Sequence, residues 1–137
     1  MNVLVALAWP NHVHHTRAQA WFASARDAGW ATCPVTESGF VRVSSNTRAI
    51  PGAVTPWEAI RVLGQIRALP GHVFWSDDVS PTDATAVAFE RVVGYRQVTD
   101  AHLLSVAIRN DGSLATFDRG VVELASNGDS AAVQSIP

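Results

Sequence analysis

Lysine is absent from this sequence of 137 residues, and all ten of its basic residues are arginines. The formal net charge of -2 argues against a protein that binds nucleic acid by bulk electrostatics, since such domains usually carry a basic excess. Any contact with nucleic acid must therefore be local. The sequence also lacks a glycine-rich phosphate loop, which together with the missing lysine ranks a phosphatase or phosphoryl-transfer domain low.

Cysteine and long apolar runs are scarce as well. Cys33 is the only cysteine, so no internal disulfide can form, and no secretory leader with a cleavage site is recognisable. We therefore expect a protein of the reducing cytoplasm. Polar residues or proline interrupt every apolar stretch before it reaches the ~20 residues that span a bilayer, so no membrane partner is expected. The length suits a single domain over residues 1–137.

Helix-start signals divide the sequence into six predicted helices. One signal is Thr55-Pro56-Trp57-Glu58, a capping box with proline at the first helical position, and Pro70-Gly71 ends that helix. Other expected N-caps are Asn11, Thr36 and Thr99. The predicted helices run from Asn11 to Gly29, from Glu37 through Val43, from Thr55 to Pro70, from Ser80 to about Val93, from Asp100 to about Arg109, and from about Arg119 to Ser126.

Short apolar segments between these helices have the length of strands. They cover Trp30 to Val35, His72 to Trp75, Ser113 to Phe117 and Ala131 to Ile136. The segment from Ser44 to Thr55 is a predicted loop, and Asp111-Gly112 a predicted turn. Alternating strands and helices favour a parallel sheet covered on both faces, so the predicted class is α/β.

Three acids stand where such a fold binds ligands. Glu37 and Asp118 follow predicted strands, and Asp100 begins a helix. In open parallel sheets, ligands bind beyond the carboxyl ends of the strands, and carboxylates gathered there would suit a hard cation such as Mg²⁺. A simpler explanation is that acids are stabilised in the first turn of a helix, by roughly 0.3 to 1 kcal/mol each. The pattern alone leaves both explanations open.

Four motifs are more specific than the pattern of acids. They are Asn2-Val3-Leu4-Val5-Ala6-Leu7, Thr36-Glu37-Ser38-Gly39-Phe40-Val41-Arg42, Val98-Thr99-Asp100-Ala101-His102-Leu103-Leu104 and Ala115-Thr116-Phe117-Asp118-Arg119. In order and approximate spacing they resemble PIN-domain ribonuclease toxins of the VapC type, which belong to type II toxin-antitoxin systems. The resemblance runs from residue 2 to the end of the chain.

This resemblance implies both a fold and an activity. The fold would be a three-layer α/β/α sandwich with a mostly parallel central sheet. The activity would be endonucleolytic cleavage of tRNA or rRNA that depends on Mg²⁺ or Mn²⁺, neutralised by a VapB-type antitoxin, in a protein that forms a homodimer. Glu37, Asp100 and Asp118 match the family's metal-binding acids, and Thr116 matches a small hydroxyl residue that supports the site. Such a cluster would hold the ion and stabilise charge on the phosphate.

The first motif departs from the family pattern. In the family it reads aspartate, any residue, asparagine; Asn2 matches the asparagine, and the aspartate would stand two positions earlier. We therefore expect a truncated first strand, and our hypothesis is that Met1 is a mis-assigned start. The alternative is a catalytically inactive PIN-like protein that only binds an antitoxin.

Other residues suggest other sites. A zinc site could be built from five histidines, His12, His14, His15, His72 and His102. However, His14 and His15 would point in different directions on a helix. Cys33 could be a nucleophile, but a small cysteine in an apolar strand is commonly buried and inert.

Some polar and aromatic residues could contact RNA or metal. Phosphate contacts could come from Arg17, Arg42, Arg48 or Arg119; a solvated face is the alternative for each, and Arg119 is favoured. Trp57 is the tryptophan expected to be exposed, whereas packing is expected for most of the others. The pair Asp77-Asp78 is interpreted as a solvated turn.

Overall fold

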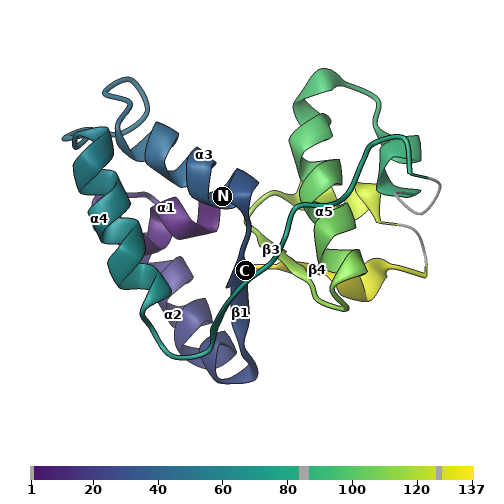
Figure 1. Cartoon of the computed structure of the whole chain (residues 1–137), viewed down its shortest axis with the longest axis horizontal. Coiled ribbons are helices and arrows are strands. Elements are labelled where there is room, and N and C mark those ends of the chain that lie inside the picture. Colours follow the sequence, from purple (N-terminus) through teal and green to yellow (C-terminus); the bar gives the residue numbers. More distant parts are fainter. Residues whose placement is uncertain (1, 84–86, 126–127) are drawn as a thin grey trace. The chain divides into compact units, whose positions relative to one another are not determined.

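Two pairs of parallel strands organise the chain. The computed structural model describes residues 2–83, 87–125 and 128–137. In it, β1 (Trp30–Thr32) pairs with β2 (His72–Phe74), and β3 (Leu114–Thr116) pairs with β4 (Val133–Ser135). The first pair belongs to the unit Met1–Ser76 and the second to the unit Asp77–Pro137 (Figure 1). The predicted α/β class and parallel pairing are confirmed, with the strands in two sheets.

In residues 2–76, the first unit also contains four α-helices and one 3-10 helix. They are α1 (Asn2–Ala8), α2 (His15–Ala25), the 3-10 helix η1 (Arg26–Ala28), α3 (Pro34–Ser44) and α4 (Pro56–Arg67). Helix α1 packs against α2 and α3, and α3 packs against α4. The core that they enclose contains Leu4, Val5, Phe40, Ile50, Ala59 and Leu63. Because α1 already begins at Asn2, the described residues contain no part of the truncated first strand.

The starts of α3 and α4 show where local signals decide the structure. Helix α4 begins as predicted: Glu58 donates its N–H to Thr55 Oγ1 at 3.2 Å, and its carboxylate accepts the N–H of Thr55 at 2.8 Å. Helix α3 begins earlier than predicted, because Pro34 suits the first helical position and makes the buried Cys33 the N-cap. Strand β1 therefore ends before Cys33, within the predicted strand.

Two other predicted N-caps are wrong. His14, not Asn11, precedes α2, because successive turns link His12 to Trp9 and His15 to His12 before the helix starts. Helix α5 (Val98–Arg109) begins before Thr99 because the 3-10 helix η3 (Tyr95–Gln97) continues directly into it. N-cap residue types also suit ordinary turns, as at Asn11, whereas Thr99 lies within the first turn of α5 itself.

The second unit packs α5 against short 3-10 helices: η2 (Val87–Arg91), η4 (Arg119–Leu124) and η5 (Ser130–Ala132). Its core contains Ala88, Ala101, Leu104, Leu124, Ala125 and Ala132. The predicted helix from residue 119 is thus a 3-10 helix, in a segment whose Gly120 and Val121 favour an α-helix poorly.

The helix predicted from Ser80 is only partly present. Ser80 and Asp83 close a single turn, with the Ser80 N–H donating to Asp83 Oδ2 at 2.9 Å, and the later residues form η2. Residues 84–86 and 126 of the predicted helices lie outside the described residues. The turn predicted at Asp111-Gly112 is confirmed, and Asp111 has a φ of 53°. No helix in the described ranges is long and apolar enough to cross a lipid bilayer.

Candidate functional site

Asp118 lies two residues after Thr116, the carboxyl end of the short strand β3 (Leu114–Thr116). Its backbone N–H donates to Oγ1 of the buried Thr116 at 3.0 Å, and its Oδ1 accepts the N–H of Gly120 at 2.8 Å. A Cβ atom at position 120 would lie 3.2 Å from that Oδ1. Thr116 therefore shapes the turn, while Gly120 orients the carboxylate.

Asp100 occupies the first turn of α5 and is half-buried. Burial raises the pKa of its carboxyl, and the negative charge of Asp118 raises it further. The salt bridges among the described residues involve neither carboxylate. The second unit thus brings together two predicted site residues whose repulsion is not relieved by a salt bridge.

Glu37 lies in the first turn of α3 and is held by two neighbours. Its Oε1 accepts a hydrogen bond of 2.6 Å from the hydroxyl of Thr32, which is buried at the end of β1. Arg67, the last residue of α4, places Nε 3.2 Å from Oε1 and Nη1 3.4 Å from Oε2. The Glu37 side chain is only 15% exposed. Its carboxylate is therefore ion-paired and oriented.

His72 extends this network from β2. Its Nε2 lies 2.8 Å from Thr32 Oγ1, and its ring packs edge-on against Trp30 with centroids 4.7 Å apart. Burial lowers the pKa of His72, and the positive charge of Arg67 lowers it further, against the opposing effect of Glu37. His72 is thus held mainly neutral at pH 7.

The predicted site residues are divided between the two units. Glu37 belongs to the first unit, whereas Asp100 and Asp118 belong to the second. Within neither unit do three histidine, cysteine, aspartate or glutamate side chains of the described residues gather closely enough to hold a metal ion. Asn2 is the exposed first residue of α1, and Arg119 is the exposed first residue of η4.

Sequence reasoning missed the partners of Glu37. Thr32 and Arg67 were not among the predicted site residues, and His72 was considered only as a zinc ligand. One local signal was available, because Thr32 ends a strand just before the helix that carries Glu37. The contacts of Arg67 and His72 depend on how α4 and β2 pack, which no local motif reports.

The acidic pair after β2 is more than a solvated turn. His102 Nε2 donates a hydrogen bond to Asp77 Oδ1 at 2.8 Å, and Asp78 forms an ion pair with Arg109 at 3.0 Å. His102 and Arg109 both lie on α5, so these two contacts hold Asp77-Asp78 against that helix. Trp57 is 68% exposed, as predicted.

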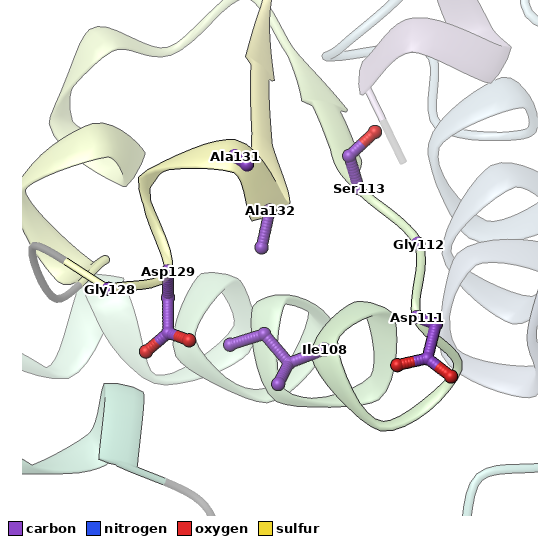
Figure 2. Close-up of a pocket in the computed structure, with 8 residues that line it drawn as sticks. All are labelled: Ile108, Asp111, Gly112, Ser113, Gly128, Asp129, Ala131 and Ala132. Carbon is purple, nitrogen blue, oxygen red and sulfur yellow. The ribbon is translucent and has the colours of Figure 1, made fainter.

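A separate hollow of about 390 Å³ lies at the amino-terminal ends of β3 and β4. Figure 2 shows Ile108 of α5 projecting between the carboxylates of Asp111 and Asp129. Asp118 follows the opposite, carboxyl end of β3, and none of the predicted acids lines the hollow. This hollow is therefore not the predicted acidic site.

Comparison with known proteins identifies the family of this chain. The family model described as PIN domain matches residues 1–127. Ribonuclease VapC38 of Mycobacterium tuberculosis is 53% identical over 125 residues, covering 91% of this chain and 86% of that protein. Ribonuclease VapC39 of the same organism is 47% identical over 128 residues, covering 93% and 92%. The chain therefore belongs to the PIN-domain family, and within it to the VapC type.

Proposed function

We propose that this chain is a metal-dependent endoribonuclease, the toxin of a toxin-antitoxin module, which hydrolyses phosphodiester bonds in tRNA or rRNA. Membership of the PIN family and the similarity to proteins named ribonucleases support the reaction type. The observation that carries the proposal is the pair of Asp100 and Asp118. Among the described residues neither carboxylate forms a salt bridge, and burial and the charge of Asp118 raise the pKa of Asp100.

The proposed cofactor is Mg²⁺, with Mn²⁺ as a substitute. Glu37, Asp100 and Asp118 are the proposed ligands, and their oxygen donors are the kind that these hard cations prefer. When bound, the ion would supply positive charge to the phosphate and acidify water. The repulsion between the two aspartates fits such a cation, since a dication nearby would favour both ionised carboxylates.

The chain's own residues would prepare the site and hold the RNA. Thr116 supports Asp118 through the backbone N–H at 3.0 Å, and Asn2 is the proposed supporting residue from the first motif. Arg119 is exposed directly after Asp118, which suits a local contact with an RNA phosphate near the cleaved bond. A single such contact is compatible with the net charge of -2.

We also infer how the protein is assembled. The two units together would make one PIN domain, since the family match runs across their boundary at residues 76 and 77. The proposed partners are a VapB-type antitoxin and a second copy of the chain, and the proposed compartment is the cytoplasm. The VapC names of the relatives support the proposal of neutralisation by an antitoxin.

The test is cleavage of a mixture of tRNA and rRNA with Mg²⁺, with Mn²⁺ and with EDTA. We expect cleavage in the two metal-containing reactions only, its loss in Asp100→Asn, and its retention in the control Asp27→Asn, whose side chain is 88% exposed. Equal cleavage by Asp100→Asn and the parent chain would refute the assigned site. Binding of an antitoxin without any cleavage would support the inactive PIN-like alternative.

A further inference from the structure

Arg67 presents a planar cation beside a proposed metal ligand. Its Nε and Nη1 atoms lie 3.2 and 3.4 Å from the two carboxylate oxygens of Glu37. The Arg67 side chain is 42% exposed, whereas that of Glu37 is 15% exposed. Nη1 donates a hydrogen bond to Oε2, whereas the contact from Nε to Oε1 is an ion pair. A guanidinium that pairs with a carboxylate can also pair with a phosphate. Arg67 is thus accessible to an anion from solution.

The ion pair with Arg67 restricts what Glu37 can bind. The Thr32 hydroxyl and Arg67 Nε share Oε1, while Arg67 Nη1 approaches Oε2. A metal ion at Glu37 would meet both an occupied carboxylate and the repulsion of the nearby guanidinium. Metal binding at Glu37 is therefore weakened as long as Arg67 stays in place.

Glu37 has a second hydrogen-bond partner, Thr32, that does not depend on Arg67. Thr32 is 2% exposed, is fixed in β1, and is itself held by His72 at 2.8 Å. Its hydrogen bond would keep Glu37 oriented and leave Oε2 open. On the other side, the Arg67 guanidinium lies 5.1 Å from the ring centroid of Phe74, a cation-π contact that keeps Arg67 at this surface.

Phe74 adds a feature that suits RNA. Its side chain is 45% exposed at the end of β2, next to the guanidinium of Arg67. An exposed aromatic ring beside an arginine offers a stacking surface for an unpaired base together with a contact for its phosphate. An RNA strand is therefore the anion that this surface fits best.

We propose that Arg67 exchanges partners during the reaction cycle. It pairs with Glu37 in the RNA-free protein and with an RNA phosphodiester in the complex, and its departure frees Glu37 for the metal ion. This inference rests on the proposed function, to which it adds an RNA contact and a coupling between RNA and metal binding. Thr32 and His72 act as positioning residues that keep Glu37 in place during the exchange.

The first test measures binding of a short, single-stranded, fluorescently labelled RNA by anisotropy in EDTA, where no cleavage takes place. Arg67→Gln should lower the affinity roughly tenfold, as expected for a lost charged hydrogen bond. It should also reduce the slope of log K against log salt by about 0.7, the value for one phosphate contact with a single strand. Arg61→Gln on the same helix removes the same charge, and it should change the RNA affinity and the salt slope much less than Arg67→Gln does. Equal results for the two variants would overturn the proposal.

The second test measures binding of Mg²⁺ alone by isothermal titration calorimetry, without RNA. Arg67→Gln should bind Mg²⁺ several-fold more tightly than the parent chain, and this gain should vanish in the Glu37→Gln background. A gain that persists without Glu37 would show general electrostatics and overturn the exchange. Circular dichroism checks that each variant is folded.

The two tests separate this inference from the proposed function. If the parent chain binds Mg²⁺ and loses that binding in Asp100→Asn, the proposed metal site stands. If Arg67→Gln then matches Arg61→Gln in both tests, only the exchange fails. If the parent chain neither binds Mg²⁺ nor cleaves RNA, the proposed function itself fails.

Discussion

The Nε2 atom of His72 donates a hydrogen bond to the hydroxyl of Thr32, 2.8 Å away. The direction follows from the third partner, because the single proton of that hydroxyl is directed at Glu37 Oε1 at 2.6 Å. The hydroxyl can therefore only accept from the ring, which must carry its proton on Nε2. This chain of hydrogen bonds orients the Glu37 carboxylate from the interior of the first unit.

Replacing Thr32 by valine measures how much this hydroxyl contributes to the stability of the fold. Valine keeps the shape but leaves the His72 donor without its acceptor, so we expect a loss of roughly 1 to 3 kcal/mol in the free energy of unfolding. Thr32→Ser keeps the hydroxyl and loses one methyl group, at a cost of about 0.8 kcal/mol. Urea denaturation of both variants checks this. Equal losses, or a larger one for serine, would contradict the hydrogen-bonded role.

The pKa of His72 predicts how stability varies with pH. Burial first, and then Arg67, lower this pKa from the ordinary value of 6.5, so the folded protein binds fewer protons than the unfolded chain. The contribution of His72 to the stability of the fold is therefore complete above pH 6.5 and is lost as the pH falls through the pKa of His72 in the folded protein. In His72→Gln, stability measured from neutral to mildly acidic pH should fall less steeply than in the parent chain. Parallel curves would contradict the lowered pKa.

Asp100 should behave in the opposite sense. Burial and Asp118 raise its pKa above the ordinary 3.8, so its contribution to stability is complete below pH 3.8 and is lost as the pH rises through the folded pKa. Asp100→Asn should therefore raise Tm at pH 7 and converge with the parent chain toward pH 3.8, in metal-free buffer. The same substitution should abolish Mg²⁺ binding. A Tm that drops at neutral pH would show that the carboxylate stabilises the fold.

These residues also mark what was predictable from the sequence. The start of α4 could be predicted from the sequence, because Thr55, Pro56 and Glu58 lie within one helical turn. The placing of Asp118 after a strand and of Asp100 in the first turn of α5 also needed only local patterns. Signals of this kind fail where the same residue types form turns, as Asn11 does.

Long-range packing was not predictable in the same way. Thr32 and His72 are 40 residues apart, and Glu37 and Arg67 are 30 apart. Their contacts require β1 to pair with β2 in one particular register, Trp30 opposite His72. Short apolar segments such as Trp30 to Val35 and His72 to Trp75 do not specify a register by themselves. The acids of the candidate site were therefore accessible to sequence reasoning, whereas the network around Glu37 was not.

Gly71 should tolerate no side chain. It has a φ of 83°, and a Cβ atom there would lie 2.8 Å from the backbone oxygen of Arg26. Gly52 has a similar φ of 74° but open space around it, so Gly52→Ala should cost only the roughly 1 to 2 kcal/mol of a left-handed alanine. Gly71→Ala should cost about 1 to 3 kcal/mol more, because backbone must shift where β2 begins. Thermal unfolding of both variants measures the difference, and equal Tm values would argue against the close contact.

Arg119 is the remaining candidate for an RNA contact, and it can be tested apart from Arg67. It is exposed at the start of η4, directly after Asp118, so Arg119→Gln should leave Tm unchanged. If Arg119 binds one phosphate, the variant should bind single-stranded RNA more weakly in EDTA, with a salt slope reduced by about 0.7. Arg91→Gln, an exposed arginine of the same unit, is the matched control. Because a phosphate contact carries no base information, the loss should be the same for RNAs of different sequence. An affinity and slope equal to those of Arg91→Gln would make Arg119 a solvated surface residue, and a loss confined to one RNA sequence would indicate base recognition.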